Sequence, residues 1–84
     1  MALHTKAYSD FVRELRSARE LAGMTQGQLA DKLGETQSFV SKFERGERRL
    51  DVVELIHICR AMGISPAKFV ARVERRLHGQ AGQD

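Results

Sequence analysis

The stretch TQGQLADKLGETQSFVSKFERG, residues 25–46, limits most strongly what this chain can fold into. Thr25 is a good helix N-cap, and Gln28 three residues later completes a capping box. Apolar residues then recur at helical spacing, at Leu29, Ala30 and Leu33. Gly34 follows at once, and glycine is the usual residue where a helix ends in a left-handed turn. The pattern therefore predicts a short helix followed by a tight turn.

A second short helix is expected directly after this turn. Thr36 can cap its start, and Val40 and Phe43 form an inward stripe at a spacing of three residues. Gly46 marks its end. The stretch therefore predicts two short helices joined by a glycine turn, the second over about 37–45.

The outward face of the second helix is polar throughout. It carries amide, hydroxyl and ammonium groups, at Gln37, Ser38, Ser41 and Lys42. Such groups on an exposed helix suit the base edges of a DNA major groove. The alternative is an ordinary solvated face, and these residues taken alone favour that alternative.

Three further helices are predicted, one before this pair and two after it. The first covers about residues 6–22 and ends at Gly23, with apolar residues at Tyr8, Phe11, Val12, Leu15, Ala18 and Ala22. Asp51 and Glu54 form a capping box for a fourth helix. That helix is expected at the centre of the core because it is rich in apolar residues, at Val52, Leu55, Ile56, Ile58, Cys59 and Met62.

Ser65 and Pro66 form a strong start signal for the fifth helix, because serine caps and proline fits the first helical position. Its apolar side contains Phe69, Val70, Val73 and Leu77. Its basic residues, Lys68, Arg72, Arg75 and Arg76, are interpreted as a solvated face, with a dimer flank as the alternative. We expect one all-α domain over 6–78, with a flexible arm at 1–5 and a disordered tail at 79–84.

Composition narrows the class of protein. The chain has 84 residues, of which 42% are hydrophobic and 6% aromatic, which favours a single domain with an aliphatic core. A net charge of +3 permits nucleic-acid binding but does not establish it. The sequence contains no run long enough for a membrane span and no signal-peptide core. We therefore expect a cytoplasmic protein with no membrane association.

No residue pattern indicates an enzyme, a metal site or a cofactor. The histidines, His4, His57 and His78, are scattered, and none accompanies a nucleophile or carboxylate in a catalytic arrangement. Cys59 is the one cysteine and has no metal-ligand spacing around it. A buried thiol is favoured over a redox sensor for it.

The segment from about Phe11 to Val73 resembles the XRE family, the phage lambda repressor and Cro-like DNA-binding domains. The resemblance lies in several pieces in order, namely Met24-Thr25-Gln26 with Leu29-Ala30, Gln37-Ser38 with Val40-Ser41-Lys42, Glu44-Arg45-Gly46, and Ala61-Met62-Gly63-Ile64-Ser65. It implies a five-helix lambda-repressor-like fold in which the second helix of the motif enters the major groove.

The resemblance also implies roles for individual residues. Base contacts would come from Gln37, Ser38, Ser41 and Lys42, where Gln37 pairs with adenine and Lys42 reaches guanine. Phosphate contacts would come from Gln26, Thr36, Arg45, Arg48 and Arg49, although at least one of these arginines is also consistent with ordinary surface. The resemblance implies a structural ion pair between Arg19 and Glu44. Gly27, costly within a helix, indicates either a close DNA backbone or simple tolerance.

The chain departs from the family pattern at Val53, where a polar residue is common, and in the extension of apolar spacing to Leu77. These departures indicate a dimer surface of Val53, Val70, Val73 and Leu77. We expect a regulator that binds double-stranded DNA, a repressor acting as a homodimer on a palindromic operator. Two alternatives remain, namely the antitoxin of a toxin–antitoxin pair, whose partner is a protein, and a restriction–modification controller protein.

Overall fold

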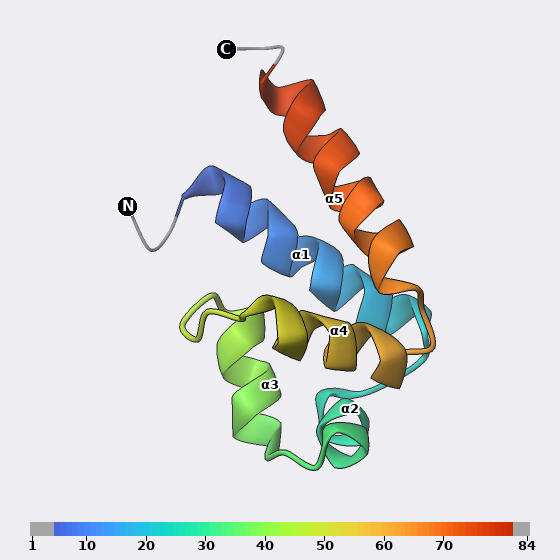
Figure 1. The fold of residues 1–84 in the computed structure, drawn as a ribbon. Coiled ribbons are helices and arrows are strands. Elements are labelled where there is room, and N and C mark those ends of the chain that lie inside the picture. The colour runs from blue at the N-terminus through green and yellow to red at the C-terminus, as the bar shows by residue number, and fades with distance from the viewer. Residues whose placement is uncertain (1–4, 82–84) are drawn as a thin grey trace.

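The computed structural model describes residues 5–81, which form five helices and contain no strand (Figure 1). The helices are α1 (Lys6–Leu21), α2 (Gln26–Leu33), α3 (Gln37–Glu44), α4 (Val52–Ala61) and α5 (Pro66–Ala81). The short helices α2 and α3 lie at one end of the molecule, and the longer α1 and α5 run away from them toward the other (Figure 1). The predicted all-α fold class is confirmed.

The two ends of the domain differ from the prediction. Thr5 belongs to the fold rather than to an arm, because its hydroxyl accepts the N–H of Tyr8 at 3.1 Å and caps α1. Helix α5 runs to Ala81, so the predicted disordered tail is wrong for residues 79–81. A glycine inside a helix costs only about 1 kcal/mol, which did not stop the helix at Gly79. Residues 1–4 and 82–84 of the predicted arm and tail lie outside the described residues.

The helix caps follow the sequence signals closely. In α2 the N–H of Gln28 donates to the Thr25 hydroxyl at 3.1 Å, and the Gln28 side chain accepts from the Thr25 N–H at 2.9 Å. The same reciprocal pair joins Asp51 and Glu54 at the start of α4. These contacts satisfy backbone donors that a helix start leaves without partners.

The core lies where the five helices meet, and its fully buried side chains are aliphatic or aromatic. The largest of them are Phe43, Leu15, Leu29, Ile58, Val40 and Cys59. The prediction that Val52 helps to form this core is wrong, because its side chain is 68% exposed. Val52 stands in the first turn of α4, whereas the buried residues Ile58 and Cys59 lie toward the other end of the helix.

Helix α5 is attached to α1 by ion pairs, in addition to the apolar core. Arg76 lies 2.8 Å from a carboxylate oxygen of Glu14 and 3.6 Å from Asp10, and Arg72 lies 3.2 Å from Glu14. Arg72 is exposed and Arg76 half-buried, so this basic side of α5 is solvated as predicted, but these two residues also hold α5 against α1. Their acidic partners stand on α1, more than fifty positions away, where local sequence patterns do not reveal them.

Candidate nucleic-acid interface

The turn between α2 and α3 places the second helix of the motif at the surface. Gly34 adopts φ of 69°, the left-handed conformation that glycine accepts without steric cost. The N–H of Glu35 donates to the carbonyl of Ala30 at 2.9 Å and closes the turn. On the inner side of α3, Val40 and Phe43 are buried in the core. Its other side therefore faces away from the protein.

The four residues predicted to contact bases share this outer side of α3. Gln37, Ser38 and Lys42 are exposed, and within the described part of the chain their side chains make no hydrogen bond or ion pair. Ser41 differs from them, because it is half-buried and its hydroxyl accepts a hydrogen bond from the Arg45 guanidinium. Three side chains are thus available to an external ligand, and Ser41 retains its own O–H as a donor.

A buried ion pair between Arg19 and Glu44 holds the end of α3 against α1. Arg19 donates from Nε to one oxygen of Glu44 at 2.7 Å and from Nη2 to the other at 3.0 Å. The two side chains are 9% and 3% exposed. The hydrogen bond to Glu44 raises the pKa of the Arg19 guanidinium above its usual value. Arg19 also donates to the carbonyl of Met24, at 2.8 Å, so one guanidinium joins α1, the next turn and α3.

Gln26 has a role that the sequence prediction missed. Its amide nitrogen donates to the same Glu44 carboxylate at 2.9 Å, so the side chain connects the start of α2 with the end of α3. One further N–H on that nitrogen, together with the exposed backbone amides of the first turn, remains suitable for an anion. The hydroxyl of Thr36 caps α3 by accepting the N–H of Phe39 at 3.2 Å.

The three arginines predicted as phosphate contacts lie in or beside the loop between α3 and α4. All are exposed, and each already contacts another side chain. Arg45 lies 2.8 Å from Glu47, Arg48 contacts both oxygens of Glu54 at 3.0 and 2.5 Å, and Arg49 lies over the Tyr8 ring at 4.1 Å from its centroid.

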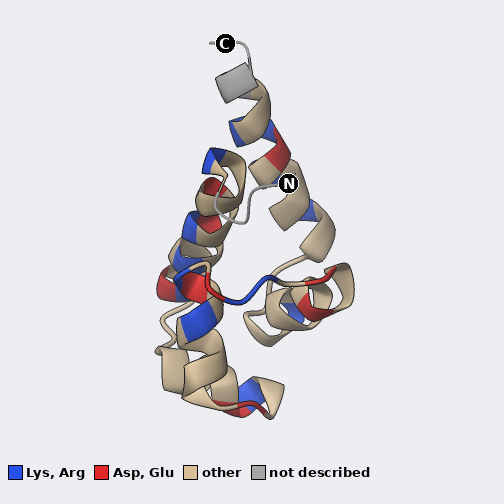
Figure 2. Ribbon diagram, turned by 90° about the vertical axis from the view of Figure 1, so that its left-hand side faces the viewer, with Lys and Arg blue, Asp and Glu red and all other residues tan. Residues whose placement is uncertain are grey.

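These carboxylate contacts change the proton affinities of the groups involved. Hydrogen bonding to Glu47 raises the pKa of Arg45, and hydrogen bonding to Glu54 raises that of Arg48. The contact with Arg48 in turn lowers the pKa of Glu54 below its usual value of 4.5. Acidic and basic positions are interspersed along the ribbon rather than gathered in one run (Figure 2). A DNA phosphate would therefore replace an internal partner of an arginine rather than meet an unoccupied one.

Two aromatic residues shape this region and were not identified from sequence as part of the site. The Phe39 ring packs edge-on against Phe43, with centroids 5.5 Å apart, and the Arg48 guanidinium lies over Phe39 at 5.3 Å. The Tyr8 hydroxyl accepts the N–H of Leu50 at 3.2 Å. The sequence identified Tyr8 only as one apolar residue of a helix stripe. Such a pattern does not indicate a contact with a residue as distant as Leu50.

The described residues indicate neither a metal site, nor a membrane span, nor a reactive thiol. Across residues 5–81, no cluster of histidine, cysteine, aspartate or glutamate is arranged to hold a metal ion. Helices long and apolar enough to cross a membrane are likewise absent from this range. Cys59 is fully buried, and its desolvation raises the pKa of the thiol to about 11. At neutral pH that thiol is protonated and weakly nucleophilic.

A helix-turn-helix family model matches residues 15–69, a range that contains the caps of α2, α3 and α4, the glycine turn and the Arg19–Glu44 pair. No curated protein matches the chain.

Several solved structures share the fold. An XRE-family like protein from Pseudomonas syringae pv. tomato is 44% identical, with a TM-score of 0.79, covering 83% of this chain and 85% of that chain. The restriction–modification controller protein C.AhdI from Aeromonas hydrophila is 31% identical, with a TM-score of 0.68 and coverage of 74% and 94%. The clp gene regulator ClgR from Corynebacterium glutamicum is 26% identical, with a TM-score of 0.78 and coverage of 94% and 84%.

Proposed function

The chain belongs to the XRE family of helix-turn-helix proteins and is a DNA-binding transcription regulator, and from this premise we propose that it is a repressor. In this proposal it binds a palindromic operator in the cytoplasm as a homodimer. Repression follows from occupancy, because a protein seated on promoter DNA blocks access to it.

The observation that carries the proposal is the outer side of α3. Gln37, Ser38 and Lys42 stand exposed on a helix whose inner side is locked into the core. In the major groove, a glutamine amide can pair with adenine and a lysine can reach guanine O6 or N7. We assign base contacts to these three residues and a supporting contact to Ser41, whose hydroxyl is already held by Arg45.

Phosphate contacts in this proposal come from both sides of α3. The first turn of α2 offers Gln26 and backbone amides, and Thr36 lies just before α3. Arg45, Arg48 and Arg49 lie beyond its other end, where each would exchange or share its internal contact for a phosphate. Such contacts fix register on the duplex and make binding dependent on salt.

The proposed dimer uses apolar residues of α4 and α5. Val53 and Val70 are 57% and 49% exposed, a large exposure for valine, and Val73 and Leu77 are half-buried. Pairing of two copies through such a surface would remove it from water and present two recognition helices about 34 Å apart, one turn of DNA. The palindromic operator follows from the two-fold symmetry of that dimer.

The proposal is tested by selecting bound duplexes from a random DNA library with the full chain. We expect a palindrome with half-sites about 10 base pairs apart, centre to centre. Binding without sequence enrichment would contradict the proposed operator, and enrichment of a single half-site would contradict the dimer. Measuring the mass of the free protein and of the complex in solution gives the oligomeric state independently.

Variants then assign the readout to α3. Gln37→Ala and Lys42→Ala should each weaken binding to the selected operator by about 1–3 kcal/mol and relax preference at one position per half-site. Arg13→Ala is the control, because Arg13 is exposed on α1 and has no ion pair in the described range. Equal losses in Arg13→Ala and Lys42→Ala would attribute the effect to net charge alone.

Control of a restriction–modification operon is a second candidate, because the chain is 31% identical to the controller protein C.AhdI. The two candidates share their DNA chemistry and differ in the gene that they regulate. Mapping of the selected operator on the source genome separates them. A site directly upstream of endonuclease and methyltransferase genes would support the controller role, whereas sites elsewhere would leave the general repressor.

A further inference from the structure

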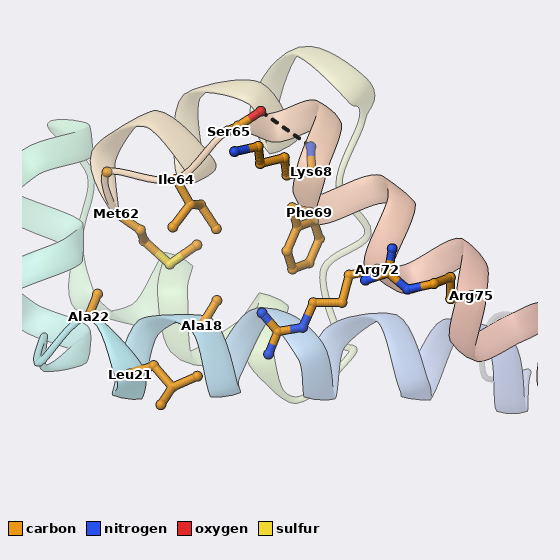
Figure 3. Close-up of a pocket in the computed structure, with 11 residues that line it drawn as sticks. Ala18, Leu21, Ala22, Met62, Ile64, Ser65, Lys68, Phe69, Arg72 and Arg75 are labelled. Atoms are coloured by element: carbon orange, nitrogen blue, oxygen red, sulfur yellow. Dashed lines mark hydrogen bonds between the residues drawn. The ribbon is translucent and has the colours of Figure 1, made fainter.

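A hollow of about 620 Å³ opens on the side of the molecule formed by α1, α5 and the turn that joins α4 to α5 (Figure 3). Its lining includes Ala18 and Leu21 of α1, Ile64 of the turn, and Phe69 of α5. Helix α5 contacts α1 and α4, whereas the recognition helix α3 packs against α1 and α2. The hollow therefore belongs to a part of the bundle that the proposed DNA contacts do not use.

Two cations border the hollow without an internal counter-charge. Arg72 and Arg76 are paired with the carboxylates of α1. Lys68 and Arg75, the other basic residues of α5, are exposed and form no ion pair within residues 5–81. Their spacing of seven residues puts both on the same side of the helix. The edge of the hollow thus carries two positive charges that no acidic residue of the described chain neutralises.

The placement of the charges and of the exposed apolar surface favours an elongated occupant over a small molecule. Lys68 lies beside Ser65 and Ile64 of the turn, and Phe69 and Arg72 lie between it and Arg75 (Figure 3). Lys68 and Arg75 are about 10 Å apart along the helix axis at 1.5 Å per residue. Phe69 and Met62 at the floor are only 3% and 6% exposed, so a small ligand would cover little apolar surface there. The exposed apolar surface lies at the rim, where Leu21 is 77% exposed.

We propose that this hollow, bordered by Lys68, Arg75 and Leu21, docks an acidic amphipathic segment of a partner protein. Two carboxylates of the segment, about two helical turns apart, would pair with Lys68 and Arg75. Apolar side chains of the segment, beyond the carboxylate that pairs with Lys68, would cover Ile64 and Leu21. Opposite charge along α5 and apolar contact beside the turn that precedes it give both attraction and register. Because α3 is not involved, the partner would bind while the protein is on its operator.

The test uses fluorescence anisotropy with a labelled 16-residue helical peptide as the probe. The peptide carries two glutamates seven residues apart and leucines on the same face, beyond the glutamate that is expected to pair with Lys68. A matched peptide has glutamine in place of both glutamates. With the full chain, we expect the glutamate peptide to bind at least tenfold more tightly than the glutamine peptide. Equal affinity for the two peptides, or no binding of either, would overturn the proposal.

Charge reversal locates the binding. Lys68→Glu with Arg75→Glu should weaken binding of the glutamate peptide at least tenfold. The control pair, Arg13→Glu with Lys32→Glu, changes the net charge equally at exposed sites elsewhere and should change the affinity less than threefold. A similar loss in both pairs would reduce the effect to overall charge and overturn the proposal.

Two further measurements make the outcome decisive. A peptide with lysines in place of the glutamates should bind the Lys68→Glu/Arg75→Glu protein better than it binds the original, a gain that an unfolded variant could not give. Hexanoate, a small amphipathic anion, should not displace the glutamate peptide at millimolar concentration. Displacement would assign the hollow to a small carboxylate and overturn docking of a protein segment.

Discussion

The hydroxyl of Tyr8 accepts the backbone N–H of Leu50 at 3.2 Å and so joins α1 to the loop that follows the recognition helix, 42 positions later. The ring of the same residue lies under the guanidinium of Arg49, 4.1 Å from its carbon. One side chain therefore holds both the backbone and a cation of the basic loop.

We expect Tyr8→Phe to lower the free energy of unfolding by about 1 kcal/mol, because the N–H of Leu50 loses its acceptor while the ring under Arg49 remains. Urea denaturation measures this change. Tyr8→Leu removes the ring as well and should also weaken operator binding, since Arg49 is then no longer positioned. Equal operator affinity in Tyr8→Leu and the original protein would show that this contact serves the fold alone.

A double-mutant cycle tests the buried pair of Arg19 and Glu44. Each single alanine variant should lose about 3 kcal/mol of stability, because it leaves the other charge buried without its partner. The double variant should lose less than the sum by at least about 1.5 kcal/mol. Gln26→Ala is a milder companion that removes one hydrogen bond to Glu44, at about 1 kcal/mol. If the stability losses from Arg19→Ala and Glu44→Ala add up in the double variant, the interaction between the two side chains does not contribute to stability.

Gly27→Ala tests whether glycine at this position is needed for folding or for DNA binding. A Cβ at this position would meet only the Thr25 hydroxyl, at 3.9 Å, so the protein itself leaves room for alanine. The substitution should therefore raise stability by about 0.4–1 kcal/mol, through lower freedom of the unfolded chain. We also expect at least threefold weaker operator binding, because a nearby DNA backbone is the remaining reason for glycine. Unchanged affinity would leave simple tolerance as the explanation.

The contact of Arg48 with Glu54 predicts a specific dependence of stability on pH. Because folding lowers the pKa of Glu54 below its usual 4.5, its stabilisation is complete above that value. It is lost as the pH falls through the folded pKa. The melting temperature of Glu54→Gln should thus lie below that of the original protein at pH 7, and the difference should shrink below about pH 4. The exposed Glu74→Gln control should show no such convergence; a constant gap for Glu54→Gln would contradict the assignment.

The sequence predicted the helices and the turn because the interactions that define them are local. The two residues of each capping pair lie within one helical turn of each other. Thr25 with Gln28 and Asp51 with Glu54 are three residues apart, and both capping boxes are present. Gly34 acts through its own backbone conformation. Such features need no knowledge of the tertiary fold.

The contacts that the sequence did not predict join distant elements. The contact of Gln26 with Glu44 depends on how α2 and α3 cross, and those of Arg72 and Arg76 depend on how α5 lies along α1. The pair of Arg19 and Glu44 was anticipated through the family resemblance, because single residues of that type carry no local sign of their partner. The exposure of Val52 was also not predicted, because it depends on the tertiary fold. Periodicity identifies the apolar face of a helix, but it does not show which part of that face the neighbouring helices cover.

The caps at Thr25 and Thr36 and the closed turn at Gly34 have a thermodynamic consequence for binding. Both helices of the motif are ordered before any duplex arrives, and the ends of α3 are held from within the protein. Little conformational entropy is then left to lose on docking beyond the side chains that reach the bases. The heat-capacity change of binding accordingly reports surface dehydration at the interface rather than the folding of a segment.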